Sequence, residues 1–249
     1  MKISIITVAY NAENTIEDTI CSVLEQEYED IQYIIIDGKS TDQTLEIIDR
    51  YKRHIHQVVS EPDQGIYDAM NKGISLADGD VIGILNADDV YENEKVISRV
   101  VEKMQENNAD ALYADLLYVH PKNLDKVKRK WISGLYKEGL FLKGWMPPHP
   151  TFFLKKEHYN SKGCYSTELK SAADYELMLR MIHKHNIQTV YLPEVIVKMR
   201  TGGESNVSLR NRWNANKEDR RAWKMNGLKP KMFTTIRKPL SKVGQFFKK

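Results

Sequence analysis

The feature that most constrains this chain is the alternation of short apolar runs with helical patterns over residues 3–104. The apolar runs fall at Ile3–Val8, Tyr33–Ile36, Gln57–Val59 and Val81–Leu85, and apolar residues at helical spacing follow at 14–24, 40–51, 66–76 and 96–104. Buried strands that alternate with amphipathic helices are typical of a mostly parallel sheet with helices on both faces. The sequence therefore predicts an α/β fold. Asn14, with Glu17 three residues later, is expected to cap the first helix.

The second half of the chain has a less regular pattern. Strands are expected at Ala111–Val119, Lys126–Ile132, Thr151–Leu154 and Val190–Val197, and helices at Asp174–His185 and Leu209–Met225. Residues 135–144 are expected to form a loop or a short helix. We therefore predict one α/β domain over residues 1–208, with mixed strands in its second half. A basic helical extension over residues 209–249 follows it.

Composition excludes several classes of protein. Hydrophobic residues make up 41% of the chain and charged residues 29%, which is typical of a soluble globular protein. The two cysteines, Cys21 and Cys164, lack the paired spacing of a metal cluster or a disulfide framework and resemble reduced cytosolic thiols. No apolar run reaches the ~18 residues of a spanning helix, and Met1–Val8 is interpreted as a strand.

Charge is distributed unevenly along the chain. Residues 210–249 contain 13 Lys and Arg and 2 Asp and Glu, a net charge of +11, so residues 1–209 carry 3 − 11 = −8. Within 229–249, basic residues alternate with apolar and aromatic ones, a combination suited to an anionic membrane surface. We expect a cytoplasmic protein that contacts the inner face of the membrane peripherally. A solvated tail is the alternative, and nucleic acid is not expected because no recognition module is present.

Polar clusters follow three of the predicted strands. They are Tyr10-Asn11, the segment from Asp37 to Asp42, and Asp88-Asp89. Ligands of open α/β sheets bind beyond the carboxyl ends of the strands, so these clusters mark the candidate site. No Gly-x-Gly-x-x-Gly follows the first strand and no phosphate-binding Gly-x-x-x-x-Gly-Lys-Ser/Thr is present, which argues against dinucleotide oxidoreductases and P-loop enzymes.

The adjacent carboxylates in Asn86-Ala87-Asp88-Asp89 suggest a divalent cation. Mg²⁺ and similar hard ions take one or two protein carboxylates, and substrate phosphates and water complete their shell. The alternative is an acidic pair at the start of a helix, where Asp is common. The residues alone leave both interpretations open.

Four segments together resemble a known family. They are Thr7-Val8-Ala9-Tyr10-Asn11, then Ile34-Ile35-Ile36-Asp37-Gly38-Lys39-Ser40-Thr41-Asp42, then residues 60–73 with Gly65-Ile66-Tyr67-Asp68-Ala69-Met70-Asn71-Lys72-Gly73, and Asn86-Ala87-Asp88-Asp89. In this order they resemble family 2 glycosyltransferases of the GT-A fold, in the branch that builds bacterial capsule, exopolysaccharide and O-antigen (lipopolysaccharide) repeats. The resemblance covers about Lys2 to Ser208 and implies the GT-A, or nucleotide-diphospho-sugar transferase, fold.

The resemblance also implies roles for individual residues. The nucleotide-binding residues would be Thr7, Tyr10, Asn11, Asp37, Ser40, Asp68, Lys72 and Asp88. Asp37 would accept a hydrogen bond from the base. Asp42, in the same motif, would bind the nucleotide or would only cap a helix. Asp89 would be the main ligand of Mn²⁺ or Mg²⁺, and Asp88 would contact the ribose or the metal. Lys39 departs from the glycine that most members carry.

An inverting transfer needs a base that takes the proton of the acceptor hydroxyl. In Ser171-Ala172-Ala173-Asp174-Tyr175-Glu176, the resemblance implies Asp174 as this base, with Glu176 as the rival; a simple helix cap at Asp174 is the alternative. His149, held between prolines, is a weaker candidate beside the acceptor or the diphosphate. The segment Arg200-Thr201-Gly202-Gly203-Glu204-Ser205 resembles a loop that closes over the diphosphate, or is an ordinary turn.

The expected function is therefore an inverting, metal-dependent transfer of a sugar from a nucleotide-diphospho-sugar donor. The resemblance favours a uridine donor, and guanosine and thymidine donors are the alternatives. The acceptor is expected to be a hydroxyl of a saccharide or a lipid-linked saccharide in cell-surface polysaccharide synthesis. Two alternatives remain at this point. One is a nucleotidyltransferase that makes nucleotide sugars, although its glycine-rich loop after the first strand is missing. The other is a non-catalytic, membrane-associated assembly subunit.

Overall fold

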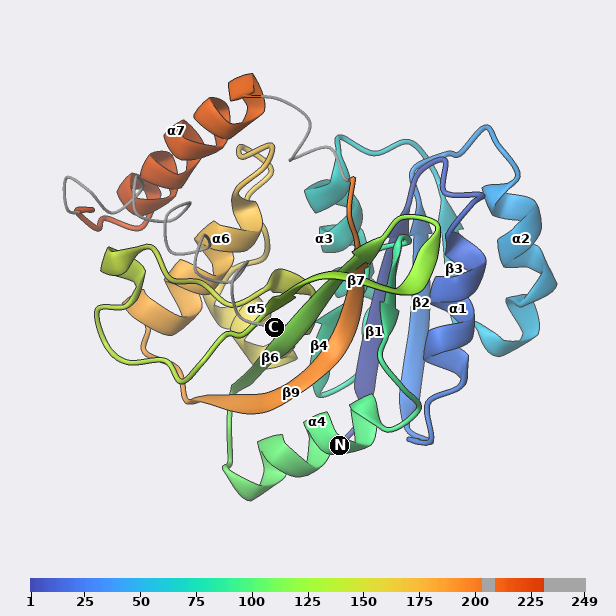
Figure 1. The fold of residues 1–249 in the computed structure, drawn as a ribbon, viewed down its shortest axis with the longest axis horizontal. Coiled ribbons are helices and arrows are strands. Elements are labelled where there is room, and N and C mark those ends of the chain that lie inside the picture. The colour runs from blue at the N-terminus through green and yellow to red at the C-terminus, as the bar shows by residue number, and fades with distance from the viewer. Residues whose placement is uncertain (203–208, 231–249) are drawn as a thin grey trace.

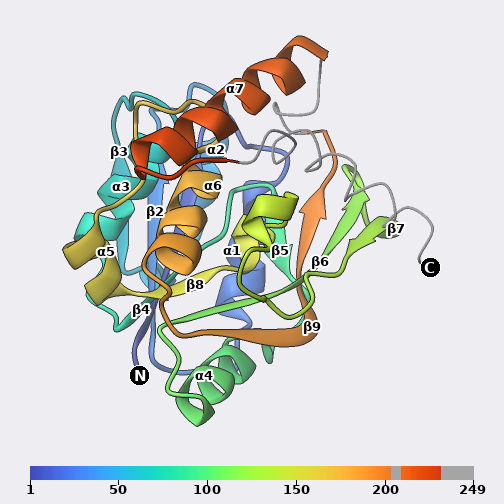
Figure 2. The ribbon, with the colours of Figure 1, turned by 90° about the vertical axis from the view of Figure 1, so that its left-hand side faces the viewer.

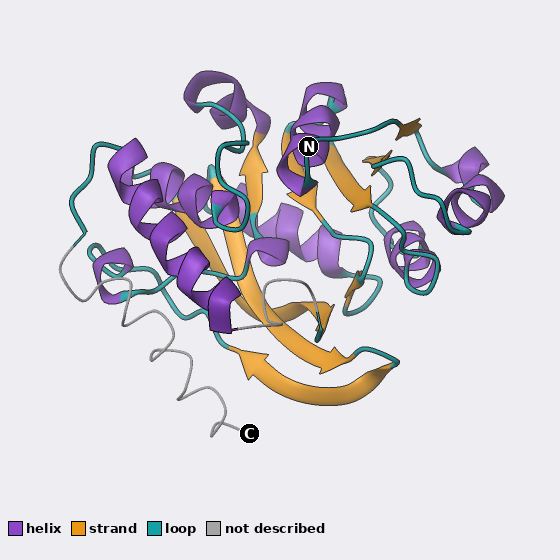
Figure 3. Ribbon diagram, turned by 90° about the horizontal axis from the view of Figure 1, so that it is seen from above, coloured by secondary structure: helices purple, strands orange, loops and turns teal. Residues whose placement is uncertain are grey.

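The computed structural model describes residues 1–202 and 209–230, which build one mixed sheet flanked by helices (Figure 1). In this part of the chain the strand order is β3-β2-β1-β4-β8-β6-β9-β5, and β7 pairs with β6 beside this path. Seen from above, helices lie on both sides of the sheet (Figure 3). The predicted α/β class is confirmed.

The first half of the chain forms the parallel part of the sheet. Its strands are β1 (Ile3–Ala9), β2 (Ile31–Asp37), β3 (Gln57–Ser60) and β4 (Val81–Ile84), and β1 lies between β2 and β4. The connecting elements are α1 (Ile16–Leu24), α2 (Thr44–Arg50), the short η1 (Lys52–His54), α3 (Ile66–Leu76) and α4 (Val96–Glu106). Each apolar run predicted as a strand is a strand. Strands β1, β2 and β4 are buried along nearly their whole length, which accounts for their mainly apolar sequences, whereas β3 is only partly buried.

The second half adds strands in both directions. They are β5 (Asp89–Tyr91), β6 (Ala111–His120), β7 (Asn123–Trp131), β8 (Phe153–Lys155) and β9 (Thr189–Arg200). The helical segments are η2 (Phe141–Lys143), η3 (His149–Thr151), α5 (Lys156–Lys162), α6 (Ala173–Met178), its π-helical continuation η4 (Leu179–Lys184) and α7 (Leu209–Met225). Strand β8 runs antiparallel between β4 and β6, whereas β6 and β9 are parallel. The predicted mixed second half is confirmed.

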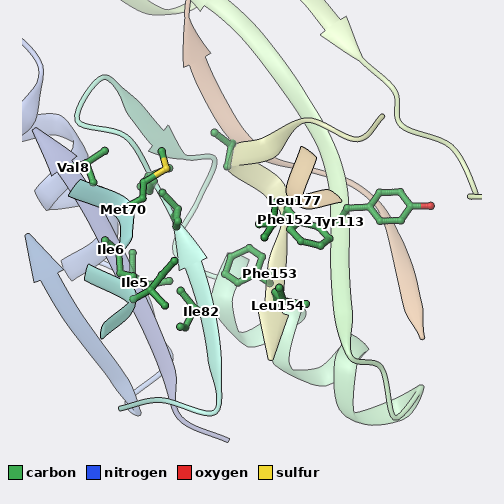
Figure 4. Close-up of a cluster of buried hydrophobic side chains, with 14 of the residues drawn as sticks. Ile5, Ile6, Val8, Met70, Ile82, Tyr113, Phe152, Phe153, Leu154 and Leu177 are labelled. Atoms are coloured by element: carbon green, nitrogen blue, oxygen red, sulfur yellow. The ribbon is translucent and has the colours of Figure 1, made fainter. Parts of the chain in front are cut away.

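The core is built mainly from isoleucine, valine and aromatic side chains on both faces of the sheet. Figure 4 shows Ile5, Ile6 and Ile82 on β1 and β4 near Phe153 and Leu154 of β8. Two glycines permit the closest packing. A Cβ on Gly73 of α3 would lie 2.4 Å from Ile6 Cγ2, and one on Gly83 would lie 2.5 Å from Phe153 Cε1. A side chain at either position would push helix or strand away from its neighbour.

The predicted cap of the first helix is wrong. Helix α1 begins at Ile16 after Thr15, and no side chain caps it. The backbone N–H groups of Thr15 and Ile16 donate instead to the carbonyl oxygen of Ala12. The Glu17 carboxylate accepts a hydrogen bond from Tyr51, the residue after α2, at 2.8 Å. A main-chain turn and a tertiary contact thus use the groups that a capping box would need.

Helix α7 packs against the domain in its described C-terminal half, beside α6 (Figures 1 and 2). Trp223 is 1% exposed, and its indole N–H donates to the Tyr175 hydroxyl at 2.9 Å. Asn226 donates to the Glu176 carboxylate at 2.9 Å. A domain boundary at residue 209 stays a prediction. Residues 231–249 of the basic tail lie outside the described residues, and no described helix is long and apolar enough to cross a membrane.

Candidate active site at the carboxyl edge of the sheet

The candidate site lies where β1, β2 and β4 end. These three strands are parallel neighbours, so their carboxyl ends share one edge. Two main-chain bonds join the segments that follow them: Gly38 N–H donates to Ala9 at 2.8 Å, and Ala87 N–H donates to Val8 at 3.2 Å. The segment after β2 and the Asp88-Asp89 segment are thus both attached to the end of β1.

Asp37 organises the segment after β2. Its side chain is fully buried, and its carboxylate accepts hydrogen bonds from the Ser40 backbone N–H at 3.0 Å, from the Ser40 hydroxyl and from the Ser60 hydroxyl at 2.7 Å. Ser40 Oγ in turn accepts from the Asn11 backbone N–H at 2.8 Å. Asp37 therefore fixes the backbone of the segment that follows β2. Its direct bond to a base stays a prediction.

Gly38 lies close to the side chains of Asp63 and Tyr10. A Cβ at this position would lie 2.4 Å from Asp63 Oδ2 and 3.4 Å from Tyr10 Cδ2, so a larger residue would have to displace the Asp63 carboxylate. The Tyr10 ring is 65% exposed, which is unusual for a large aromatic side chain in a monomer. An exposed ring beside a bare backbone segment is suited to stacking on a planar base.

Two residues in this rim have left-handed backbones. Asn11 has φ 49° and Lys39 has φ 64°. The Asn11 side chain is held by a tertiary bond, because its carbonyl oxygen accepts the Thr41 N–H at 2.9 Å. A lysine lacks such a bond, which gives a physical reason for the glycine expected from the resemblance at position 39.

The remaining residues that were predicted to bind the nucleotide differ in their exposure to solvent. Thr7 is fully buried, with its hydroxyl 3.1 Å from that of Tyr33 beneath the rim. Asp68 and Lys72 lie on α3 and form an ion pair at 3.5 Å, and Lys72 Nζ also lies 2.9 Å from Glu61. This pairing raises the pKa of Lys72, chiefly through Glu61. The structure therefore brings the ammonium of Lys72 to Glu61, while Thr7 supports the strand.

Asp88 and Asp89 occupy different environments. Asp88 is partly exposed, whereas Asp89 begins β5 and is fully buried. Neither carboxylate oxygen of Asp89 has a hydrogen-bond partner among the described residues. Burial and the Asp88 charge raise the pKa of Asp89 well above its ordinary value, and Arg200 opposes this. Burial likewise raises the pKa of Asp88, against the charges of Arg200 and His149.

The acidic pair fits a divalent cation. A buried carboxylate without a partner is costly unless a proton or a cation compensates it, and hard cations bind carboxylate oxygens. Asp89 supplies such a carboxylate, and Asp88 supplies a second one that solvent reaches. The alternative role, an acidic pair at a helix start, is wrong, because Asp89 starts a strand that pairs with β9.

Arg200 holds this acidic segment from the end of β9. It is 7% exposed, and its guanidinium donates to the Asp88 carbonyl at 2.7 Å, to the Asp18 carboxylate and to the Pro121 carbonyl at 3.1 Å. A buried guanidinium with three acceptors fixes the main chain that carries the two carboxylates. The sequence pattern placed Arg200 in a loop over the diphosphate, of which residues 203–205 lie outside the described residues.

Asp174 faces the same site from the first turn of α6. Helix α6 begins after Ala172, and no side chain caps it, so a capping role for Asp174 is not supported. The Tyr67 hydroxyl donates to Asp174 Oδ1 at 3.2 Å, and His149 Nδ1 lies 3.6 Å from Oδ2. The Asp174 side chain is 17% exposed. A carboxylate oriented on both sides yet open to solvent has the features of a general base.

His149 links the candidate base to the acidic segment. Its Nε2 lies 3.3 Å from the Asn86 amide nitrogen. With Asn86 as donor, neutral imidazole carries its proton on Nδ1, the nitrogen that faces Asp174. Asn86 opens the segment that continues to Asp88 and Asp89, so the candidate base and the candidate metal ligands are joined through one imidazole.

Glu176, the rival base, does not join this cluster. Its carboxylate is buried and pairs with the Arg180 guanidinium at 2.9 and 3.0 Å. Asn226 donates a further bond to it. These partners lie beneath α7, so the structure gives Glu176 a role in packing.

The β6–β7 hairpin carries a cluster of aromatic rings and one guanidinium. The Arg129 guanidinium lies 4.2 Å from the centre of the Tyr118 ring, which stacks on Trp131. Burial raises the pKa of Tyr118, Arg129 lowers it, and the charges of Asp89 and Asp174 raise it further. The hairpin thus carries a titratable phenol whose pKa depends on both carboxylates.

A second group with metal-ligand chemistry lies at the opposite edge of the sheet. The ligand atoms of Asp110, Glu157 and His158 lie within 4.8 Å of one another. Asp110 precedes β6, which runs parallel to β4, so it lies away from the strand ends that carry Asp88. Its carboxylate already pairs with Lys155 at 3.1 Å and accepts the Gln188 N–H at 3.1 Å. This group belongs to no site described above.

Sequence reasoning missed Asp63, Tyr67, Tyr118 and Arg129. Tyr67 lay within a quoted motif, but nothing in the motif indicates that its hydroxyl reaches Asp174, which is distant in sequence. Asp63 lies in the same segment of the resemblance but received no role from it, and Tyr118 carries no local signal. The alternation of apolar and basic residues in 126–132 predicted the hairpin but not which face meets the site.

Comparison with known proteins gives one family. The sequence model of the family described as glycosyl transferase family 2 matches residues 4–168 of this chain. A protein named PGL/p-HBAD biosynthesis glycosyltransferase from Mycobacterium bovis is 26% identical over 208 residues, 82% of this chain and 78% of the relative. A glycosyltransferase of Mycobacterium tuberculosis is 31% identical over 180 residues, 72% of this chain and 68% of its own. The putative teichuronic acid biosynthesis glycosyltransferase TuaG of Bacillus subtilis is 37% identical over 109 residues, 43% of each chain.

Solved structures share the fold. S. aureus TarS in complex with UDP-GlcNAc has a TM-score of 0.71 at 19% identity, over 91% of this chain and 65% of that chain. The chain thus spans slightly less than two thirds of that relative. The mannosyltransferase PcManGT from Pyrobaculum calidifontis, in complex with GDP-Man and Mn²⁺, has a TM-score of 0.67 at 18% identity, over 97% and 69% of the two chains. The predicted GT-A fold is confirmed.

Proposed function

The chain belongs to glycosyl transferase family 2, and from that premise we propose that it moves a sugar from a nucleotide-diphosphate donor to a saccharide hydroxyl, with inversion. The observation that carries this proposal is the contact series from Asp174 through His149 to Asn86. It joins a candidate base to the acidic segment that would hold the donor. A reaction in which a base and a leaving-group site act on one carbon needs this arrangement.

The donor side is the rim around Gly38. The exposed Tyr10 ring and the backbone ordered by Asp37 and Asn11 would hold the base and ribose. Solved proteins of the same fold were captured with UDP-GlcNAc and with GDP-Man, which supports a nucleotide-diphospho-sugar. We propose a UDP-sugar, carrying a hexose or an N-acetylhexosamine, as the first donor to test.

A divalent cation would be held by Asp89 and by the more accessible Asp88. When bound, it would neutralise the charge on the departing nucleoside diphosphate. Mn²⁺ was present with GDP-Man in the fold relative, and Mg²⁺ has the same preference for carboxylate oxygen. Arg200 keeps the two carboxylates in place, because its guanidinium binds both the Asp88 carbonyl oxygen and the Asp18 carboxylate of α1.

The transfer is a single displacement. The acceptor oxygen forms a bond to the anomeric carbon as the bond from that carbon to the diphosphate oxygen breaks, and the nucleoside diphosphate leaves. The proton of the acceptor hydroxyl passes to the carboxylate of Asp174. Tyr67 and His149 orient that carboxylate, and Tyr67 keeps its own proton because burial and the Asp174 charge raise its pKa well above the ordinary value.

The acceptor is proposed to be a lipid-linked saccharide of a cell-surface glycan. The similar proteins named for PGL/p-HBAD and teichuronic acid biosynthesis support an acceptor of this class. We place the enzyme at the cytoplasmic face of the membrane, to which a lipid-linked acceptor would be confined.

The direct test incubates the full chain with a panel of sugar nucleotides and Mn²⁺ and measures the released nucleoside diphosphate. We expect release with one donor class, and loss of turnover with retained donor binding in Asp174→Asn. Asp78→Asn, which changes an exposed carboxylate that pairs with Lys2, is the matched control and should keep full activity. Pyrophosphate as product would show a nucleotidyltransferase instead. Release from no donor would favour a non-catalytic assembly subunit.

A further inference from the structure

Residues 122–137, which we call the basic edge, carry a charge opposite to the rest of the domain. They contain Lys122, Lys126, Lys128, Arg129, Lys130 and Lys137 and only one acid, Asp125, a net charge of 6 − 1 = +5. The other residues of 1–209 then carry −8 − 5 = −13. A strongly basic segment on an acidic body concentrates positive potential in one place.

The basic edge lies at the margin of the molecule. Strand β7 pairs only with β6 among the described strands, and Figure 2 shows it at the side away from α5 and α6. In Figure 3 the hairpin is the outermost element along the lower border of the view. Lys126, Lys128 and Lys130 are exposed. Their charges therefore point to solvent.

Exposed apolar side chains accompany these lysines. Val127 is 51% exposed, Ile132 45% and Leu135 69%, and together they make up half of the large exposed hydrophobic side chains in the described residues. Lysine at a sheet edge has an ordinary explanation, since it prevents edge-to-edge pairing. That explanation favours charge alone and does not account for three apolar side chains held in solvent next to it.

The backbone beneath these apolar side chains is firmly anchored. Ser133 donates from its N–H to Asp115 at 2.9 Å and from its hydroxyl to Ala114 at 2.6 Å. The Tyr113 hydroxyl donates to the Gly134 carbonyl at 3.0 Å and accepts the Tyr136 N–H at 2.7 Å. Trp131 and Ser133 are buried on either side of Ile132. Ile132 and Leu135 are thus presented outward by a fixed main chain.

We propose that the basic edge is a docking surface for an anionic lipid bilayer. Lysine ammonium groups would bind headgroup phosphates, and Val127, Ile132 and Leu135 would enter the interface between headgroups and acyl chains. Basic residues beside apolar ones bind anionic membranes by these two contributions together. Charge complementarity selects this partner, since the acidic remainder of the domain is repelled by the same surface.

Docking in this way would place the candidate site next to the membrane. The same hairpin carries Tyr118 with Arg129 over its ring, and the charges of Asp89 and Asp174 raise the pKa of Tyr118. A lipid-linked acceptor could then reach Asp174 without leaving the bilayer surface. This consequence rests on the proposed function, whereas binding of the bilayer itself does not.

The test is co-sedimentation of the full chain with vesicles of phosphatidylcholine that contain phosphatidylglycerol, and with vesicles of phosphatidylcholine alone. A lysine near an anionic membrane contributes about fivefold to affinity, so the variant K126Q/K128Q/K130Q should bind the anionic vesicles roughly 100-fold more weakly. The matched control K52Q/R53Q/K184Q removes the same charge from exposed residues elsewhere and should bind as the unmodified chain does. I132S/L135S should also weaken binding while the charge is unchanged.

The full chain keeps the basic residues of 229–249 in every variant, so only the difference between variants is read. Equal binding by the two triple variants would overturn the proposal, as would equal binding of the unmodified chain to both kinds of vesicle. Nucleoside diphosphate release from a soluble donor is measured in parallel. Its persistence in K126Q/K128Q/K130Q shows that the fold is intact, and its absence from the unmodified chain would count against the proposed function alone.

Discussion

Replacing Asp89 with asparagine should stabilise the metal-free protein. Asp89 is fully buried, and its two carboxylate oxygens have no hydrogen-bond partner among the described residues. A buried polar group in this state costs roughly 1–3 kcal/mol, and more when it is charged. Asparagine has nearly the same shape and carries no charge. We expect Asp89→Asn to raise the free energy of unfolding by about 2 kcal/mol, or Tm by roughly 4–8 °C.

The gain should depend on pH in a defined direction. Because burial and the Asp88 charge raise the pKa of Asp89 in the folded state, the unmodified protein loses stability as pH rises above the ordinary Asp value, about 3.9. Below that pH the carboxyl is protonated in both the folded and unfolded states. The advantage of Asp89→Asn should therefore vanish near pH 4 and grow toward neutral pH.

Thermal unfolding in chelator, followed across this pH range, measures the effect. Asp37→Asn is the matched control, because Asp37 is equally buried but accepts hydrogen bonds from Ser40 and Ser60. That variant should lose roughly 1–3 kcal/mol. If Asp89→Asn lowered Tm at neutral pH as Asp37→Asn does, the carboxylate of Asp89 would have a compensating partner and the argument for a cation there would lose its basis.

Three further predictions test other parts of the structure. Tyr67→Phe should lower kcat about tenfold with little change in the KM for the donor, because the Tyr67 hydroxyl orients Asp174. A change in the donor KM larger than the change in kcat would contradict this. Lys39→Gly should raise stability by about 0.5–1 kcal/mol, since φ is 64° there, and a fall in Tm would refute the strain. Trp223→Ala should cost roughly 3–5 kcal/mol in chemical unfolding if α7 belongs to the domain, whereas an unchanged midpoint would make α7 an independent appendage.

Much of the fold was predictable because its signals are local. Helix α3 was predicted with its observed bounds, Ile66–Leu76, from a single run of helical spacing after Gly65. The parallel strands were predicted because a strand buried on both faces must be a continuous apolar run. Strand β5 was not predicted, since its three residues pair with β9 from the far end of the domain and carry no pattern of their own.

The candidate site was predictable only as a set of residue types. The position of Asp88 and Asp89 after β4 indicated an acidic edge, but their unequal burial depends on the pairing of β5 with β9. In the same way, Asp174 and Glu176 are equivalent in sequence. Tertiary contacts separate them, because Tyr67 and His149 reach Asp174 whereas Arg180 and Asn226 bind Glu176.

The central claim is that Asp88 and Asp89 hold a divalent cation that binds the donor diphosphate. Titration of Mn²⁺ into the full chain, followed by the electron paramagnetic resonance of the free ion, tests it most directly. We predict that the unmodified chain binds Mn²⁺ and binds it more tightly when UDP or GDP is added, and that Asp89→Asn does neither. Equal Mn²⁺ binding by the two proteins, with no effect of any nucleoside diphosphate, would contradict the claim.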